Sequence, residues 1–184
     1  MHTHVNTKLP GVAALTGFAN ESPSCQHGTT YLAFPVGTVD NPVSGYRQAY
    51  EIQASLPTSL NNSWTVIESY SMKGVQAVDW DSTAFPERQN NLLISPFIMY
   101  KPTGDEKDDR ALDNEAAKYG KRMRDAIADA AGQKLNAYVN YAVGDERLEE
   151  IYGHESWRLE KLMRLKREYD PEGRFGSYNP IPQY

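Results

Sequence analysis

The chain has 184 residues, a formal net charge of −5, 40% hydrophobic residues and 23% charged residues. A chain of this size fits one globular domain that buries a core without disulfides or metal, and no apolar run approaches the ~20 residues that a membrane helix needs. The acidic balance offers no broad basic field to a phosphate backbone, so we expect neither a nucleic-acid nor a membrane partner.

Residues 1–28 are rich in small and turn-forming types and show no hydrophobic period, so we expect an irregular N-terminal remnant. His2 and His4 could chelate a transition metal, but an unstructured terminus is the simpler interpretation, and we expect no metal site. Cys25 is the only cysteine. An internal disulfide is therefore excluded, and a packing role is expected rather than a nucleophilic one.

The N-terminus does not have the form of a secretory signal, because no basic region precedes a sustained apolar core. The default expectation is a cytoplasmic protein. If a longer N-terminus exists, we expect secretion, and the glycosylation sequons at Asn20 and Asn61 then gain weight.

The first regular elements are expected after residue 28. Thr29–Val36 has the composition of a strand and is followed by a turn-rich link. From Ser44 to Leu56 the apolar residues can share one helical face, and Pro57 closes the element.

A hairpin is predicted over residues 63–80, with its turn at Lys73-Gly74. Glu68 lies in the first arm among apolar residues. If Glu68 faces a pocket, burial would raise its pKa and suit it to proton abstraction. If it faces solvent it is an ordinary strand carboxylate, which is the commoner case.

Three longer elements follow. Asn91–Tyr100 is the most β-like run, and Pro96 predicts an edge or bulged strand there because proline cannot donate to a ladder. Asp105–Ala131 is the clearest helix, with apolar residues at steps of three and four, acidic residues at its start and Gly132 as C-cap. A last helix is expected over about Ser156–Tyr169.

Leu135–Ala142 predicts a short strand whose alternation puts Tyr138 and Asn140 on one face and Tyr141 on the other. A phenol and an amide that reach the same ligand suit a polar, planar molecule. The commoner alternative is a buried tyrosine bonded to a neighbouring amide. His154, just before the last helix, is a weaker candidate for a catalytic base.

The predicted elements make an α+β fold, an antiparallel sheet covered by helices, with a C-terminal helical segment. Several catalytic signatures are absent from the sequence: GxGxxG after a strand, GxxxxGK[ST], a CxxC pair, HExxH and GxSxG. The chain is therefore not expected to bind a dinucleotide on its own.

The C-terminal sequence resembles one family. AYVNY (137–141), IYGHESWRLEKLMRLKREYDPEGRF (151–175) and NPIP (179–182) look like the C-terminal segment of the berberine bridge enzyme-like FAD-linked oxidases, especially their fungal branch. ESYSMKGVQAVDWDSTAFPERQNNLLISPFIMY (68–100) is similar to the family's sheet segment around its Thr-Ala-Phe-Pro-x-Arg motif. The resemblance covers roughly residues 25–181.

The resemblance implies FAD as cofactor and a small molecule as substrate. Tyr138 matches the catalytic tyrosine of the Y-x-N-Y pattern, and Asn140 together with Tyr138 would face the flavin ring. Ser95 falls where the family places a polar residue on the next strand, so we expect Ser95 and Glu68 in the substrate pocket.

The resemblance also divides the chain. Residues 29–184 correspond to a partial substrate-binding domain, whose C-terminal family segment covers about 134–184, and the family's flavin domain lies outside the resemblance. If the chain is an enzyme, we expect a flavin domain supplied by another chain, or a homodimer that completes the site.

Three functions are compatible with these residues. The first is FAD-linked oxidation of an intermediate of fungal secondary metabolism by hydride transfer to the flavin. The second is a flavin-independent cyclase or isomerase that keeps the pocket and polarises a carbonyl. The third is a non-catalytic binding or dimerising remnant.

Overall fold

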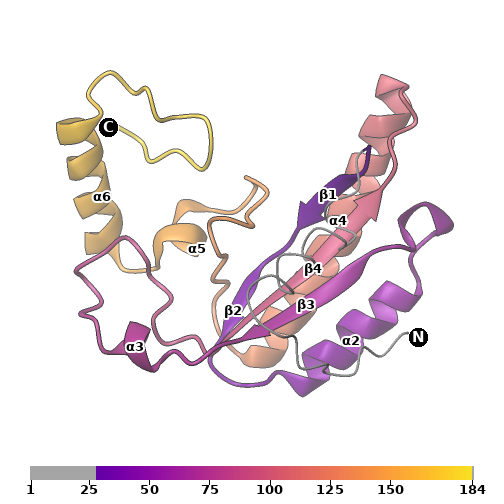
Figure 1. Ribbon diagram of the computed structural model, residues 1–184, viewed down its shortest axis with the longest axis horizontal. Helices are drawn as coiled ribbons and strands as arrows, with labels where there is room; N and C mark the ends of the chain where they lie inside the picture. Colours follow the sequence, from indigo (N-terminus) through magenta and orange to yellow (C-terminus); the bar gives the residue numbers. More distant parts are fainter. Residues whose placement is uncertain (1–27, 184) are drawn as a thin grey trace, which may run out of the picture.

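The computed structural model describes residues 28–183. A four-stranded antiparallel sheet carries two helices on one face, α2 (Val43–Ala54) and α4 (Glu106–Ala131). A C-terminal segment with α5 (Leu148–Tyr152) and α6 (Ser156–Tyr169) lies beside this layer (Figure 1). The predicted α+β fold with a C-terminal helical segment is confirmed.

The sheet is organised around β4 (Leu92–Tyr100). β1 (Thr30–Ala33) and β2 (Val36–Thr38) follow one another along one edge of β4 in a single register, and β3 (Trp64–Ser69) pairs with the other edge. The strand predicted over 29–36 is therefore two short strands on a common partner.

The prediction that Pro96 places its strand at an edge or a bulge is wrong, since β4 is the central strand. The Phe34 N–H donates to the Pro96 carbonyl over 2.9 Å, and proline has no N–H with which to return the bond. This missing bond falls at Phe34-Pro35, between the end of β1 and the start of β2. A central strand tolerates the proline here because its partner is interrupted at the same place.

The hairpin predicted over residues 63–80 is half wrong. β3 forms its first arm, but the second arm begins with a one-turn helix, α3 (Lys73–Gln76), and β3 pairs with β4 instead. A nine-residue apolar strand offers β3 more pairing and more burial than the short, mixed sequence after residue 73.

The helices match their predictions closely. The carboxylate of Asp105 accepts from the N–H groups of Lys107 and Asp108 at the start of α4, and Gly132 ends the helix with φ 64°. α2 ends two residues before the predicted Leu56, and η2 (Thr58–Leu60), a 3-10 turn, leads to β3. The core between helices and sheet consists of Phe34, Val36, Ala49, Leu60, Leu92, Ile94, Ile98, Tyr100, Ala116, Met123, Ile127 and Ala128.

The strand predicted over 135–142 is wrong, because this segment is irregular. Its backbone groups bond to separate elements: the Ala137 N–H donates to the Glu150 carbonyl, and the Asn136 carbonyl accepts from the Gly37 N–H. With one of these bonds to β2 and one to α5, the segment lacks the repeated bonds to a single partner strand that a ladder requires.

The expectations for the N-terminal remnant, for His2, His4 and Cys25, and for the sequon at Asn20 fall on residues 1–27, outside the described part of the chain. Over residues 28–183, none of the helices has the length and apolar character needed to cross a bilayer.

Candidate functional site

Tyr138 and Asn140 come together through a turn. The N–H groups of Tyr141 and Ala142 donate to the Tyr138 carbonyl over 2.9 and 3.1 Å, which closes the chain around residues 138–142. The Asn140 amide then donates to the Tyr138 hydroxyl over 2.8 Å. Since the hydroxyl oxygen accepts this bond, its own proton is available to a ligand.

Tyr141 lies on the same side as Tyr138, not opposite it as alternation predicted. Its ring contacts the rings of Tyr138 and Phe97 edge-on, with centroids 5.4 and 5.5 Å apart. The Tyr141 hydroxyl donates to Glu68 over 2.9 Å. Burial, followed by the bond to Glu68, raises the pKa of Tyr141 to about 12, so this phenol stays protonated near neutral pH.

Glu68 and Tyr138 line one cavity of about 240 Å³ on the sheet face opposite α2 and α4. Glu68 is half-buried there, directly across the β3–β4 pair from Leu93. The cavity is lined by Glu68, Tyr70, Met72, Val75, Phe85, Glu87, Asn90, Asn91, Leu92, Leu93 and Tyr138.

Ser95 does not join this group. It is fully buried on β4 opposite Val66, and its hydroxyl has no hydrogen-bond partner among the described residues. The structure thus places Glu68 and Tyr138 in one cavity wall, joins Asn140 to Tyr138 by a hydrogen bond, and leaves Ser95 outside this wall.

A second cavity, of about 260 Å³, lies on the other side of Tyr138. Three side chains line both cavities: Phe85, Glu87 and Tyr138. Asn140 lines only the second one, together with Val139, Ile151 and Tyr152 among others. Tyr138 therefore lies in the wall that the two cavities share, and Asn140 contacts its hydroxyl from the side of the second cavity.

Glu87, which the sequence analysis did not single out, is the buried acid at this wall. Its side chain is 8% exposed and accepts one hydrogen bond, from Asn90 over 3.2 Å. Burial raises the pKa of Glu87 to about 7, although the bond from Asn90 opposes the shift. The only sequence signal was a carboxylate placed between Pro86 and Arg88 of the family motif.

The loop with the Thr-Ala-Phe-Pro-x-Arg motif, residues 83–88, is called the motif loop, and two arginines hold it in place. Arg88 donates to the Val75 carbonyl over 2.9 Å and to the Thr83 hydroxyl over 2.5 Å. From α6, the guanidinium of Arg158 lies 5.4 and 4.6 Å from the ring centroids of Trp80 and Trp157, and these two rings also contact each other edge to face. The C-terminal helix thereby fixes the loop that carries Glu87.

Residues near the start of α6 have structural partners. Arg158 bonds Glu155 over 3.1 Å and the Trp80 carbonyl over 3.2 Å. His154 Nε2 lies 2.9 Å from the Leu135 carbonyl, which ties α6 to the segment before Tyr138. This bond gives His154 a structural contact outside both cavity walls.

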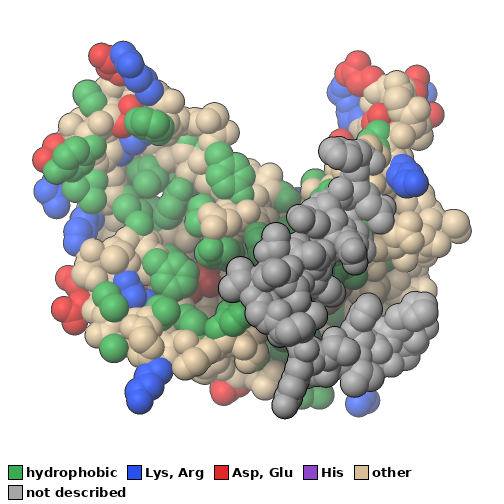
Figure 2. All heavy atoms as spheres, in the orientation of Figure 1, with side chains coloured by type: hydrophobic (Ala, Val, Ile, Leu, Met, Phe, Trp, Pro, Cys, Tyr) green, Lys and Arg blue, Asp and Glu red, His purple; other side chains and the backbone are tan. Residues whose placement is uncertain are grey.

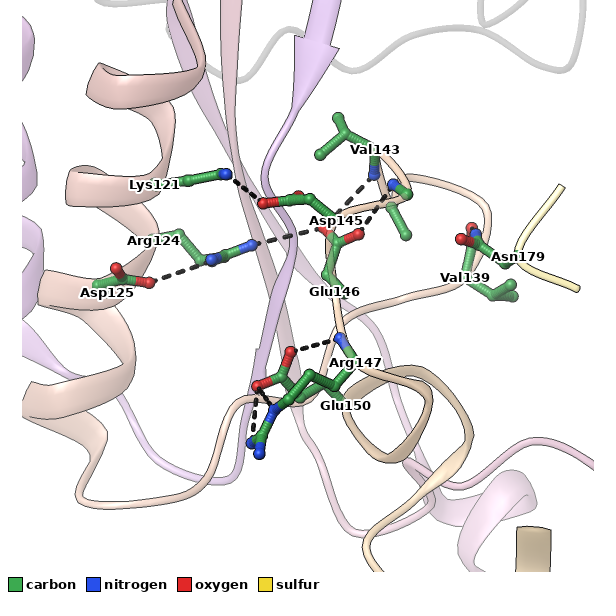
Figure 3. Close-up of polar contacts among 12 residues, drawn as sticks. Lys121, Arg124, Asp125, Val139, Val143, Asp145, Glu146, Arg147, Glu150 and Asn179 are labelled. Atoms are coloured by element: carbon green, nitrogen blue, oxygen red, sulfur yellow. Dashed lines mark hydrogen bonds and ion pairs between the residues drawn. The ribbon is translucent and has the colours of Figure 1, made fainter. Parts of the chain in front are cut away.

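An ion-pair group holds the other end of the Tyr138 segment against α4 (Figure 3). Glu146 is enclosed and accepts from Arg124 over 3.4 Å and from the Gly144 N–H over 3.0 Å. Lys121 pairs with Asp145 beside it. The turn at 138–142 is therefore fixed by α4 on one side and by β3 on the other.

Over residues 28–183, no group of three or more histidine, cysteine, aspartate or glutamate side chains could hold a metal ion. Figure 2 shows hydrophobic side chains gathered over the part of the surface near α3, α5 and α6. Within the C-terminal segment, the large exposed hydrophobic side chains include Phe175, Tyr169 and Tyr178, which are 80%, 75% and 55% exposed.

The chain is similar to known proteins of the family that its C-terminal sequence resembles. The family model described as "Berberine and berberine like" matches residues 137–182. The FAD-linked oxidoreductase chyH of Penicillium rubens is 37% identical over 92% of this chain, and the FAD-linked oxidoreductase anuG of Penicillium roqueforti is 37% identical over 97% of it.

The chain belongs to the berberine bridge enzyme-like family. It spans about a third of the length of the curated relatives it matches, 34% of chyH and 35% of anuG. Two solved structures share the fold. FgChi7B matches with a TM-score of 0.67 and 20% identity, over 94% of this chain and 39% of that one. BBE-like #28 from Arabidopsis thaliana matches with a TM-score of 0.60 and 15% identity, over 86% of this chain and 35% of that one.

Within this berberine bridge enzyme-like chain, the family match includes the Tyr138 turn, α5 and α6. The motif loop and Glu87 lie outside that match but inside the longer similarity to the fungal relatives. The cavity wall therefore joins two parts of the family sequence that are distant along the chain.

Proposed function

We propose that this chain forms the substrate side of an FAD-linked oxidoreductase that oxidises an intermediate of fungal secondary metabolism. The names of the fungal relatives support the class of enzyme. The observation that carries the proposal is the Tyr138 hydroxyl, which accepts from Asn140 in the wall between two cavities and keeps its own proton for a ligand.

The described residues fit one side of a flavin ring but not the rest of FAD. Apolar and aromatic side chains make up most of both linings. Tyr138 and Glu87 add polar groups to the shared wall, and Asn140 adds one to the second cavity. Neither lining contains a lysine, arginine or histidine among the described residues, so neither offers a phosphate site. Tyr138 and Asn140 would hold the ring, and the phosphates would need residues from elsewhere.

When bound, FAD supplies the two-electron acceptor for a hydride from the substrate. This chain's own residues bind and orient the substrate. Tyr138 would direct its free hydroxyl proton at a substrate oxygen or nitrogen, and Asn140 fixes the direction of that hydroxyl. Tyr141, bonded to Glu68 and packed edge-on against Tyr138, would hold the Tyr138 ring in position beside the cavity.

A flavin domain on another chain, or a second copy of this chain, is the partner that this proposal expects. Exposed aromatic side chains support a contact surface on the C-terminal segment, with Phe175 and Tyr169 as its most exposed members. These side chains also support the alternative of a non-catalytic, self-associating protein. Retention of flavin distinguishes the oxidoreductase component from the non-catalytic protein.

The experiment is a visible absorption spectrum of the purified chain after incubation with FAD and removal of free FAD. It is repeated after mixing with the part of the Penicillium rubens relative that this chain does not cover. We expect a flavin band to be retained at least in the mixture, and Asn140→Ala to weaken retention.

Asn61→Ala, at an exposed position outside both cavity linings, is the matched control and should retain flavin like the natural chain. Absence of the band in both samples, from a chain that circular dichroism shows to be folded, would overturn the proposal. Redox-neutral chemistry or a binding role would then replace it.

A further inference from the structure

Glu87 has one oxygen occupied and one open. Its Oε2 accepts from Asn90 over 3.2 Å. Its Oε1 has no hydrogen-bond partner among the described residues. The buried unpartnered polar atoms of this part of the chain do not include it, so Oε1 keeps some accessible surface. Because Glu87 lines both cavities, Oε1 is reachable from the space beside Tyr138.

The backbone of β2 makes room for this carboxylate. A Cβ built on Gly37 would lie 2.5 Å from Glu87 Oε2 and 2.3 Å from Asn90 Nδ2. Gly37 is itself fixed, since its N–H donates to the Asn136 carbonyl and its carbonyl accepts from Gln133. The carboxylate is therefore held in one position by a rigid surround.

Glu87 is an unfavourable residue for a purely structural role. A buried carboxylate with a single amide donor and no cationic partner lowers stability, because its charge loses hydration without full compensation. Glu87 makes no ion pair with a described residue, and Arg88 beside it bonds Val75 and Thr83 instead. A ligand that donated to Oε1 would supply the missing partner.

The charge of the cavity limits what that ligand can be. The described lining of the 240 Å³ cavity includes two carboxylates, Glu68 and Glu87, and no cationic side chain. Most of its other lining residues are apolar or aromatic. An anionic molecule would meet like charge in a site of low dielectric constant, whereas a neutral or cationic one would not.

We propose that the open oxygen of Glu87 recognises a hydroxyl or amino hydrogen of the substrate, and that the substrate is a largely apolar, neutral or cationic molecule and not a carboxylic acid. The inference rests on the proposed function in one respect, that the cavity beside Tyr138 is the substrate site. Glu87 then selects the substrate by its donor group.

The test uses three probes of similar shape and needs no FAD. Para-propylphenol carries a donor, para-propylanisole carries a methyl ether in its place, and para-propylbenzoate is anionic. Dissociation constants are measured by calorimetry at about pH 8.5, above the pKa of about 7 of Glu87, so that the carboxylate is ionised. Glu87→Gln removes the charge with little change of shape, and Glu68→Gln removes the other carboxylate of the same cavity.

We expect the natural chain to bind the phenol about tenfold more tightly than the ether, since hydrogen bonds to charged groups are strong, and to bind the benzoate more weakly than either. Glu87→Gln should remove most of the preference for the phenol, and Glu68→Gln should keep it. In the natural chain, the ¹³C chemical shift of a labelled Glu87 carboxyl should change when the phenol is added and should not change with the ether. This measurement tests the contact without any substitution.

Four results would overturn the proposal: a preference that survives Glu87→Gln, an equal loss in both variants, a Glu87 signal that does not respond to the phenol, or no measurable binding of either neutral probe. An equal loss would assign the effect to the overall charge of the cavity. None of these results bears on flavin retention, so the proposed function is tested separately.

Discussion

The Tyr141 hydroxyl donates to Glu68 Oε1 over 2.9 Å and joins two residues that are 73 positions apart in the sequence. Tyr141 belongs to the turn of the family segment, and Glu68 belongs to β3. The bond closes the wall of the cavity at the point where the C-terminal segment meets the sheet.

Tyr141→Phe removes this bond and leaves the ring contacts with Tyr138 and Phe97 in place. We expect the free energy of unfolding to fall by about 1 kcal/mol, the usual net contribution of a partly buried hydrogen bond. Chemical denaturation measures it, with Tyr50→Phe on the exposed side of α2 as control. Equal stability of the two variants would show that the bond contributes nothing.

Glu146→Ala leaves the buried guanidinium of Arg124 with only the exposed Asp125 as partner. We expect a loss of about 3 kcal/mol in the free energy of unfolding, because breaking a buried pair strands a charge. Asp145→Ala breaks the exposed pair with Lys121 next to it and should cost about 0.5 kcal/mol or less. If both variants lose the same amount, burial of Glu146 is not what makes the pair important.

Glu87 predicts a pH dependence of stability. Its carboxyl pKa is raised by burial from 4.5 to about 7, so between these values the folded protein holds a proton that the unfolded chain releases. The free energy of unfolding therefore falls as pH rises through this window, by about 3 kcal/mol for the full shift.

Glu87→Gln lacks this titration, so its stability relative to the natural chain should increase by about 3 kcal/mol from pH ~4.5 to ~8. Denaturation curves across this range measure the difference, and the exposed Glu160→Gln should follow the natural profile. Parallel profiles for Glu87→Gln and the natural chain would show that Glu87 titrates normally.

Gly120→Ala tests the close packing of α4 on the sheet. A Cβ at Gly120 would lie 2.0 Å from the ring of Phe34, which is fully buried and cannot retreat into solvent. We expect a loss of about 2 kcal/mol despite the better helix propensity of alanine. Thermal melts of both variants measure the change. Gly74→Ala in α3, with open space at its Cβ, is the control and should be neutral or slightly stabilising.

Arg158→Lys tests the link between α6 and the motif loop. Lysine keeps the charge but lacks the planar guanidinium that contacts the rings of Trp80 and Trp157. It also cannot bond Glu155 and the Trp80 carbonyl in the same geometry. We expect a loss of about 2 kcal/mol and a change in tryptophan fluorescence. Arg164→Lys, on an exposed position of α6, should change neither signal.

The helices were predictable because their determinants are local. For α4 these determinants are the apolar spacing of three and four residues, the Asp105 N-cap and the Gly132 C-cap, all of which lie within or next to the helix. The central position of β4 was not predictable, because Pro96 is tolerated only where β1 and β2 leave a gap, and that gap is set by residues more than 60 positions earlier.

The site was predictable in part. The proximity of Tyr138 and Asn140 is present in the structure, although a turn and not a strand produces it. The role of Glu87 as the buried acid depends on Gly37 and Asn90, two neighbours that the fold supplies. No spacing in the sequence around Pro86 and Arg88 reveals them.

The arrangement of the sheet constrains how this chain folds during synthesis. β1, β2 and β3 pair with β4 and, among the described residues, not with one another. Until Leu92–Tyr100 has left the ribosome, the three earlier strands have no template, and their apolar residues stay exposed to chaperones and to other chains. The interval of translation between β1 and β4 is therefore the period in which these strands are most exposed to wrong pairing.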